Sequence, residues 1–184
     1  MKKLCLLSTV VLVLLLLSGC GRERAMLSEY EDFCRRLAAS DSLSFSAKLR
    51  AEYEHKTARF TLSFRESDGI GTVEVTAPAL IAGIRATVAR NGTKLEFGDI
   101  SLDTGALDDR GLSPMSALPL LVKTLRDVSP ESCWREDGKT VVQLIADDER
   151  LCTVWFGSEG LPIRAEIISD GRVTIYMDIG EFSF

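Results

Sequence analysis

The chain has 184 residues with 22 basic and 27 acidic side chains, one His and five Cys, and a net charge of −5. This length fits a single domain that can bury roughly 70% of its unfolded surface, so folding requires neither a metal nor a disulfide. An acidic chain without basic runs argues against nucleic-acid binding. The sequence contains no recognisable catalytic motif, and we expect no enzyme activity, cofactor or metal.

Residues 1–19 have the layout of a secretory signal peptide. Two lysines precede an uncharged stretch over residues 4–17, which is shorter than the about 20 residues of a membrane span. The next residues, Leu17-Ser18-Gly19-Cys20, resemble the bacterial lipobox, whose cysteine is diacylated on sulfur with fatty acids such as palmitate, exposed by cleavage, and often acylated again on its new amine. We therefore expect lipidation of Cys20 and a short tether over residues 20–25. Secretion with a coincidental cysteine is the alternative.

The expected anchor determines where the mature protein lies. Two or three acyl chains hold stably, because each buried methylene contributes about 0.8 kcal/mol. The tether, even fully extended, spans on the order of 17 Å. We expect an extracytoplasmic protein close to a membrane: the outer leaflet of the cytoplasmic membrane, or the outer membrane of a Gram-negative envelope.

Residues 27–39 are predicted to form an amphipathic helix. Ser28 and Glu31 have the spacing of a capping box. The apolar stripe recurs at helical spacing and consists of Tyr30, Phe33, Cys34, Leu37 and Ala38.

The period changes to two after residue 42, which predicts strands around residues 42–50, 59–65, 72–76, 84–88 and 95–97. Asp68-Gly69 and Asn91-Gly92 are strong hairpin signals, because these pairs accept the positive φ angles of a type I′ turn. The strand pattern breaks over residues 104–111.

A helical insertion follows. Ser113-Pro114 is typical of a helix start, and Leu118, Leu121, Val122 and Leu125 have helical spacing. Because a proline inside a helix costs about 3 kcal/mol, Pro119 is expected to divide the insertion into a turn and a short helix.

The last third predicts five more strands, over residues 132–135, 140–145, 151–156, 163–168 and 172–177. Tight turns at intervals of about ten residues indicate an antiparallel meander. The expected fold is α+β: an antiparallel sheet of about ten strands that curves because strands twist, with an N-terminal helix and a helical insertion. Residues 26–184 form this one domain.

This order of elements, together with residues 154–156 and 160–163 in the late hairpin, resembles the LolA/LolB lipoprotein carrier superfamily. The resemblance implies an incomplete, strongly curved β-barrel, with the N-terminal helix and the helical insertion covering its concave face. Such a half-barrel holds acyl chains or another hydrophobic partner, and receptor-type members of the superfamily are lipidated. Some anchored relatives, including spore and germination lipoproteins, serve as partners of other envelope proteins. If the resemblance holds, the candidate ligand-binding residues are Phe60, Leu62, Phe64 and Trp155. Packing in a sheet core is the favoured explanation of the first three, because burial explains them without a ligand.

Other reactive residues have simpler explanations. His55, the only histidine, is expected in a solvated loop. Cys133 and Cys152 fall on strands separated by another strand, which is beyond disulfide reach, and Cys34 is expected to be a small buried apolar residue. The acidic clusters at 108–109 and 147–149 are expected to be solvated turns.

Two functions remain open, together with a weaker third. In the first, the protein holds a lipid or acylated polypeptide in its half-barrel, which predicts an apolar cavity. In the second, it is an envelope adaptor that binds another protein, which predicts a sealed core and an exposed apolar or strand-edge patch. An enzyme acting on lipid or cell wall would need His55 beside a nucleophile. We expect a monomer in each case.

Overall fold

The computed structural model describes residues 20–184 except 54–55, 90–91, 106–112 and 149. The predicted signal peptide, His55, Asn91 and the acidic pair at 108–109 therefore lie outside the described residues. The elements in chain order are α2 (Cys20–Ala39), β1 (Ser42–Tyr53), β2 (Lys56–Ser67), β3 (Ile70–Ala77), the 3-10 turn η1 (Ala79–Ile81), β4 (Arg85–Ala89), β5 (Gly92–Phe97), β6 (Ile100–Gly105), α3 (Pro114–Asp127), β7 (Pro130–Glu136), β8 (Lys139–Asp147), β9 (Arg150–Phe156), β10 (Pro162–Ser169) and β11 (Arg172–Ser183).

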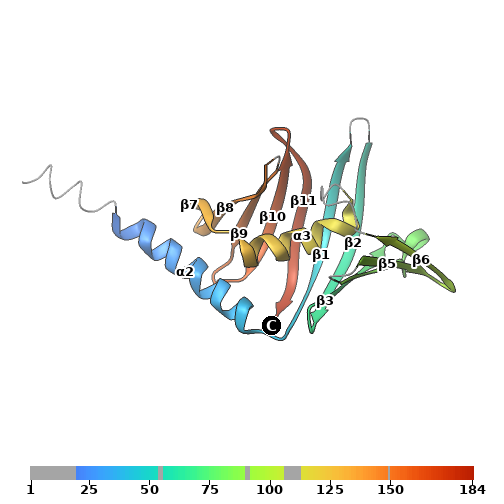
Figure 1. Cartoon of the computed structure of the whole chain (residues 1–184). Coiled ribbons are helices and arrows are strands. Elements are labelled where there is room, and N and C mark those ends of the chain that lie inside the picture. The colour runs from blue at the N-terminus through green and yellow to red at the C-terminus, as the bar shows by residue number, and fades with distance from the viewer. Residues whose placement is uncertain (1–19, 54–55, 90–91, 106–112, 149) are drawn as a thin grey trace, which may run out of the picture.

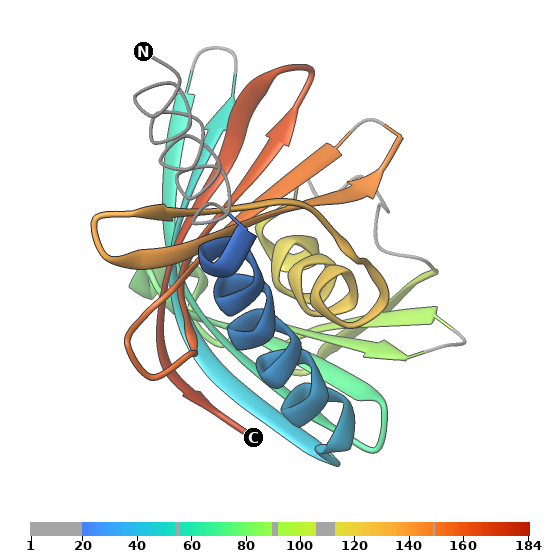
Figure 2. The same ribbon diagram turned by 90° about the vertical axis from the view of Figure 1, so that its left-hand side faces the viewer.

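All eleven strands form one antiparallel sheet in the order β6-β5-β4-β3-β2-β1-β11-β10-β9-β8-β7. The first and last strands meet at the centre, and β6 and β7 are the two edges. Because α3 connects one edge to the other, it has to cross the sheet. Figures 1 and 2 show α2 and α3 lying over the concave face of the strongly curved sheet. The expected α+β half-barrel is confirmed, and the sheet stays open.

The sequence analysis missed β6. It ended the first group of strands at residue 97 and missed the turn at Gly98, whose φ of 57° is in the left-handed region. The apolar residues of β6, Ile100 and Leu102, do alternate with polar ones. However, the strand is short, pairs with β5 only, and has no hairpin signal as strong as Asn-Gly or Asp-Gly.

Both helix predictions need correction. The first helix begins at Cys20 rather than residue 27, so Ser28 is an interior position and the predicted capping box is wrong. Residues 20–25, the predicted tether, are part of this helix. Because a helix rises only about 1.5 Å per residue, this segment is much shorter than a fully extended chain. The second helix is continuous through Pro119, because buried apolar packing along α3 offsets the hydrogen bond that the proline removes.

The core lies between the helices and the concave face. Phe45 of β1, Phe64 of β2, Val73 of β3 and Ala86 of β4 are direct cross-strand neighbours and form one row across the sheet. Each is at most 3% exposed. As predicted, Cys133 on β7 and Cys152 on β9 are separated by β8.

Candidate functional site

The concave face is filled by protein side chains. Leu62, Phe64, Leu118 and Leu121 are each at most 1% exposed, although they come from β2 and α3 on opposite sides of the core. A void large enough for water would expose the side chains that line it, so these residues pack directly on other protein atoms. The rings of Phe45 and Phe64 lie 5.1 Å apart between centroids. In this state the centre of the half-barrel is closed.

Aromatic packing holds α2 on the sheet. The ring of Phe33 lies 5.1 Å from that of Phe156 on β9, and Tyr30 lies 5.8 Å from the same ring, both edge-to-face. At the α2 surface, the Glu29 carboxylate accepts hydrogen bonds from Arg135 Nη2 at 2.8 Å and from Thr140 Oγ1 at 2.6 Å. These two polar bonds tie α2 to β7 and β8.

The two helices are also joined to each other. Tyr30 donates its hydroxyl hydrogen bond to the carbonyl of Val128 at 3.3 Å, just after α3. The Cys34 thiol donates to the carbonyl of Leu125 at 3.5 Å. Burial raises the pKa of the Tyr30 hydroxyl and that of the Cys34 thiol, so both groups stay protonated and act as donors.

The structure separates the four predicted ligand-binding residues. Leu62 and Phe64 lie in the closed core, and Phe60 is half-buried where β2 extends beyond β3. Trp155 lies on the opposite, convex face, where its cross-strand neighbour is Arg164 and the Arg164 guanidinium stacks 4.8 Å from its ring centroid. Phe60, Leu62 and Phe64 are therefore on one side of the sheet and Trp155 on the other.

An exposed apolar strip, which the sequence analysis missed, lies at the β6 edge. The core row continues from Ala86 to Leu95 and on to Leu102. The exposed fraction rises along it, from 0% at Ala86 to 58% at Leu102. Beside it, Phe97 is paired with Ile100, and they are 48% and 71% exposed. We call Phe97, Ile100 and Leu102 the edge strip.

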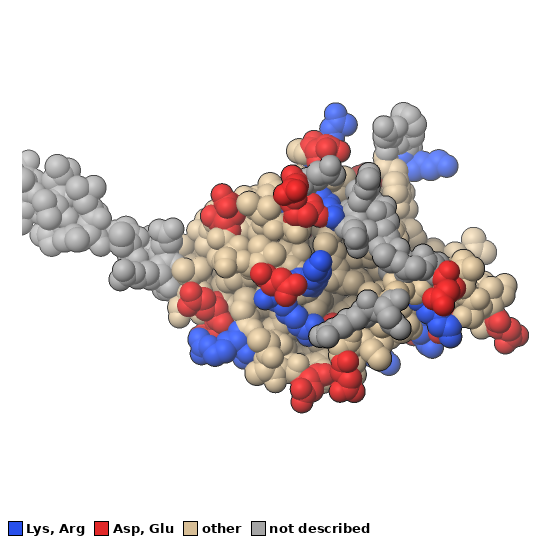
Figure 3. Space-filling view, in the orientation of Figure 1, with Lys and Arg blue, Asp and Glu red and all other residues tan. Residues whose placement is uncertain are grey.

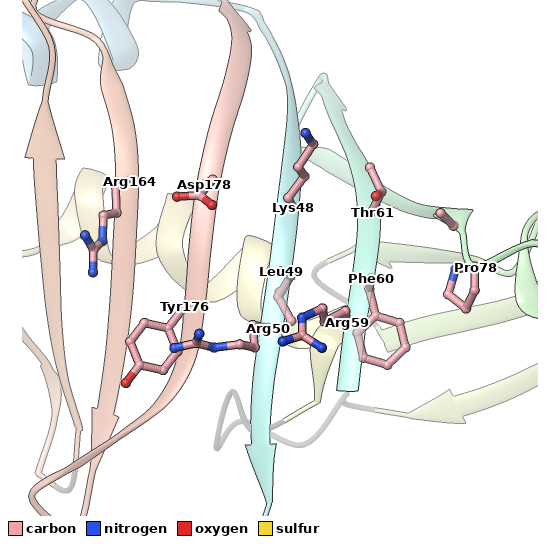
Figure 4. A pocket seen from close by; sticks show the side chains of 11 residues that line it. Lys48, Leu49, Arg50, Arg59, Phe60, Thr61, Pro78, Arg164, Tyr176 and Asp178 are labelled. Carbon is pink, nitrogen blue, oxygen red and sulfur yellow. The ribbon is translucent and has the colours of Figure 1, made fainter. Parts of the chain in front are cut away.

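A second feature is a hollow of about 610 Å³ on the convex side of the sheet, which we call the outer pocket. Its cationic side chains are Lys48, Arg50, Arg59 and Arg164, and Asp178 is its acidic one. Figure 4 shows these side chains reaching out from β1, β2, β10 and β11, with Phe60 and Pro78 on the far side of β2. The predicted function did not include this pocket.

Comparison with known proteins gives matches in structure only. No protein-family model matches the chain, and no curated protein sequence matches it. An uncharacterised conserved protein from Thermus thermophilus is similar at a TM-score of 0.50 and 11% identity, over 85% of each chain. A LolA superfamily protein from Nitrosomonas europaea is similar at a TM-score of 0.47 and 13% identity, over 88% of this chain and 93% of that chain. A chain in the complex of the CwlD amidase with the GerS lipoprotein from Clostridioides difficile is similar at a TM-score of 0.46 and 12% identity, over 84% of this chain and 93% of that chain.

The open antiparallel half-barrel of this chain is the architecture that the predicted resemblance to the LolA/LolB superfamily implies. The predicted resemblance is thus confirmed at the level of architecture. At these identities the likeness concerns the fold and not what the protein binds. Among the described helices, none has the length and apolar character that crossing a membrane requires.

Proposed function

We propose that this chain is an extracytoplasmic lipoprotein, anchored through Cys20, that binds another envelope protein at the edge strip and has no catalytic activity. The observation that carries the proposal is the contrast between a closed concave face and an exposed apolar edge. Leu62 and Leu121 are fully buried in the core, whereas Ile100 at the sheet edge is 71% exposed.

The β6 edge has the properties of a protein-binding strand. Among the strands that the structure describes, it pairs with β5 alone, so its other side offers backbone N–H and C=O groups to an added strand. Natural edges are usually protected by charge or proline. Residues 100–105 contain one charged residue, Asp103, and no proline. Exposed apolar side chains beside an open strand edge are typical of a protein-binding surface.

The proposed anchor fits a protein that works beside a membrane-associated partner. Cys20 opens α2, whose later turns pack on the sheet, so a lipid at this residue holds the domain close to the bilayer. Because the proposed anchor keeps the domain outside the cytoplasm, its partner is sought among envelope proteins.

Ligand binding in the half-barrel is the second candidate. The apolar character of the concave face supports it, since Leu62 and Phe64 belong to the same buried apolar cluster as Leu118 and Leu121 of α3. Binding requires α3 to move away from the sheet, and Phe60, Leu62 and Phe64 would then line the opened space. Trp155 on the convex face would not. Native mass spectrometry of the purified chain tests this candidate, because a co-purifying lipid supports it and the bare protein mass opposes it.

The adaptor proposal is tested by purifying the tagged lipoprotein from detergent-solubilised membranes. We expect one envelope protein to co-purify with the wild type and to be lost with Leu102→Asp. The matched control is Ile145→Asp on β8, since Ile145 is another large apolar residue and is 45% exposed. Co-purification that survives Leu102→Asp, or that is lost equally with Ile145→Asp, would overturn the proposal.

A further inference from the structure

The outer pocket concentrates positive charge on an acidic protein. Four cationic side chains, Lys48, Arg50, Arg59 and Arg164, line it with a single acidic one, Asp178, although the whole chain has a net charge of −5. On the face seen in Figure 3, by contrast, acidic and basic side chains lie beside one another. Such a local excess of one charge in a hollow attracts ions of the opposite sign.

Two of these cations form no ion pair with a described residue, whereas Arg50 pairs with Glu52 and Arg164 pairs with Glu166. Asp178 lies opposite Lys48 in the register of β1 and β11 but forms no ion pair with it. Elsewhere on the sheet Arg85 pairs with Glu74, and Lys94 pairs with Glu96. Lys48 and Arg59 form no ion pair with any residue that the structure describes. Arg59 instead lies directly opposite Arg50 in the register of β1 and β2. Like charges directly opposite each other destabilise a strand pair, and a bound anion would relieve their repulsion.

The Arg50 guanidinium is held in place by its neighbours. It lies over the ring of Tyr176 at 3.9 Å from the centroid, with the ring and guanidinium shown together in Figure 4. Its Nε lies 3.0 Å from the Glu52 carboxylate but is buried without an aligned hydrogen bond. Stacking orients a guanidinium while leaving its edge N–H groups for a planar or tetrahedral oxyanion, which arginine recognises with two parallel hydrogen bonds.

The remaining wall of the pocket is apolar. Phe60 and Leu49 are direct cross-strand neighbours whose side chains belong to the concave side of the sheet, and they reach the hollow beside Pro78 and Ala77 where β2 runs beyond the end of β3. A free inorganic anion would not use this wall. The chemistry of the pocket therefore matches a phosphate group joined to a less polar organic part.

We propose that the outer pocket binds an organic phosphate, with Arg50, Arg59 and Lys48 on the phosphate and Phe60 against the organic part. The phosphate comes from one of two sources, the headgroup of an anionic phospholipid or a soluble organic phosphate. The charged side chains of this site are on the convex face, and the site shares no residue with the edge strip, so it does not depend on the adaptor function.

The test uses residues 20–184, which contain every described helix and strand, with Cys20→Ser in all proteins. One arm measures sedimentation with vesicles of phosphatidylcholine alone and of equal parts phosphatidylcholine and phosphatidylglycerol. The other arm measures glycerol 1-phosphate binding by calorimetry. The site variant is Lys48→Gln with Arg59→Gln, and the matched control is Arg65→Gln with Arg172→Gln. Arg65 lies on the same strand and face as Arg59, about 20 Å further along, and Arg172 is exposed at the start of β11.

We expect the site variant to weaken binding at least tenfold while the control keeps it within about twofold, since a pair of charged contacts contributes about tenfold or more. The thermal midpoint of the control is expected to stay unchanged, and that of the site variant to stay unchanged or to rise, because Arg59→Gln removes the repulsion between Arg50 and Arg59. Binding to phosphatidylglycerol vesicles without competition by glycerol 1-phosphate identifies the lipid source. Direct binding of glycerol 1-phosphate identifies the soluble source. Absence of binding in both arms, or an equal loss with the control, overturns the proposal.

Discussion

Arg126, in the last turn of α3, forms an ion pair with Glu66 of β2, 60 residues earlier in the chain. Both side chains are partly shielded from solvent, at 29% and 15% exposure. The pair ties the end of α3 to the strand that also carries Leu62 and Phe64, and so helps to keep the concave face closed.

Arg126→Gln is expected to lower the free energy of unfolding by about 1 kcal/mol, because it removes one charged hydrogen bond at a partly buried site. Urea denaturation measures the change. Lys123→Gln is the matched control, since Lys123 is on the same helix and exposed. Equal effects of the two substitutions would show that the Arg126 pair does not hold α3.

Glu29→Ala is expected to destabilise the fold by about 1 kcal/mol, because it removes the acceptor shared by Arg135 and Thr140. The Glu29 and Arg135 side chains are about half exposed, so the ion pair itself contributes little and the buried Thr140 hydroxyl accounts for most of the loss. Glu31→Ala, on the exposed side of the same helix, is expected to leave stability unchanged. A loss with Glu31→Ala as large as that with Glu29→Ala would contradict this account.

The closed concave face predicts a large difference between core and edge substitutions. Leu121→Ala is expected to cost about 2–5 kcal/mol through lost packing and a new cavity. Ile100→Ala at the edge strip should stay within about 0.5 kcal/mol. Chemical denaturation of both variants checks this contrast. A cost well below 2 kcal/mol at Leu121 would mean that the face is loosely packed and already able to admit a ligand.

Burial raises the pKa of the Cys152 thiol to about 12. At a pH below 9.0, the ordinary pKa of a cysteine thiol, this thiol is protonated in both the folded and the unfolded chain, so it contributes no pH dependence to stability. As pH rises above that value the unfolded chain releases the proton first, and stability is lost progressively up to about pH 12. Unfolding curves of the wild type and Cys152→Ala, recorded from pH 8 upward, are expected to converge as pH rises; parallel curves would contradict the buried thiol.

Alternation of apolar and polar residues predicts the strands well, because each strand has one face in the core. Phe60, Leu62 and Phe64 illustrate the method: all three belong to one face of β2, as expected. The Asp-Gly signal located the hairpin at Asp68-Gly69, where both turn residues adopt positive φ. These local signals predicted the strands and their antiparallel pairing, whereas the half-barrel was implied by the resemblance to the LolA/LolB superfamily.

The surfaces that carry the proposals depend on long-range placement. The edge strip has the same alternation as a core strand, and Leu102 is exposed only because β6 ends the sheet. The pairing of Arg50 with Arg59 depends on the register of the β1–β2 hairpin, whose turn lacks a Gly signal. The proximity of Arg164 to this pair further requires β11 to lie beside β1, which joins the two ends of the chain. Closure of the concave face likewise depends on where α3 lies, and helical spacing in residues 118–125 could not specify that.

The central claim is that the protein works through its exposed edge rather than through an open half-barrel. Site-specific photo-crosslinking in living cells tests it most directly, with the crosslinking residue placed at Ile100 in one strain and at Ile145 in another. We predict a discrete crosslink to one envelope protein from position 100 and none from position 145. No protein crosslink from position 100, or the same products from both positions, would contradict the claim.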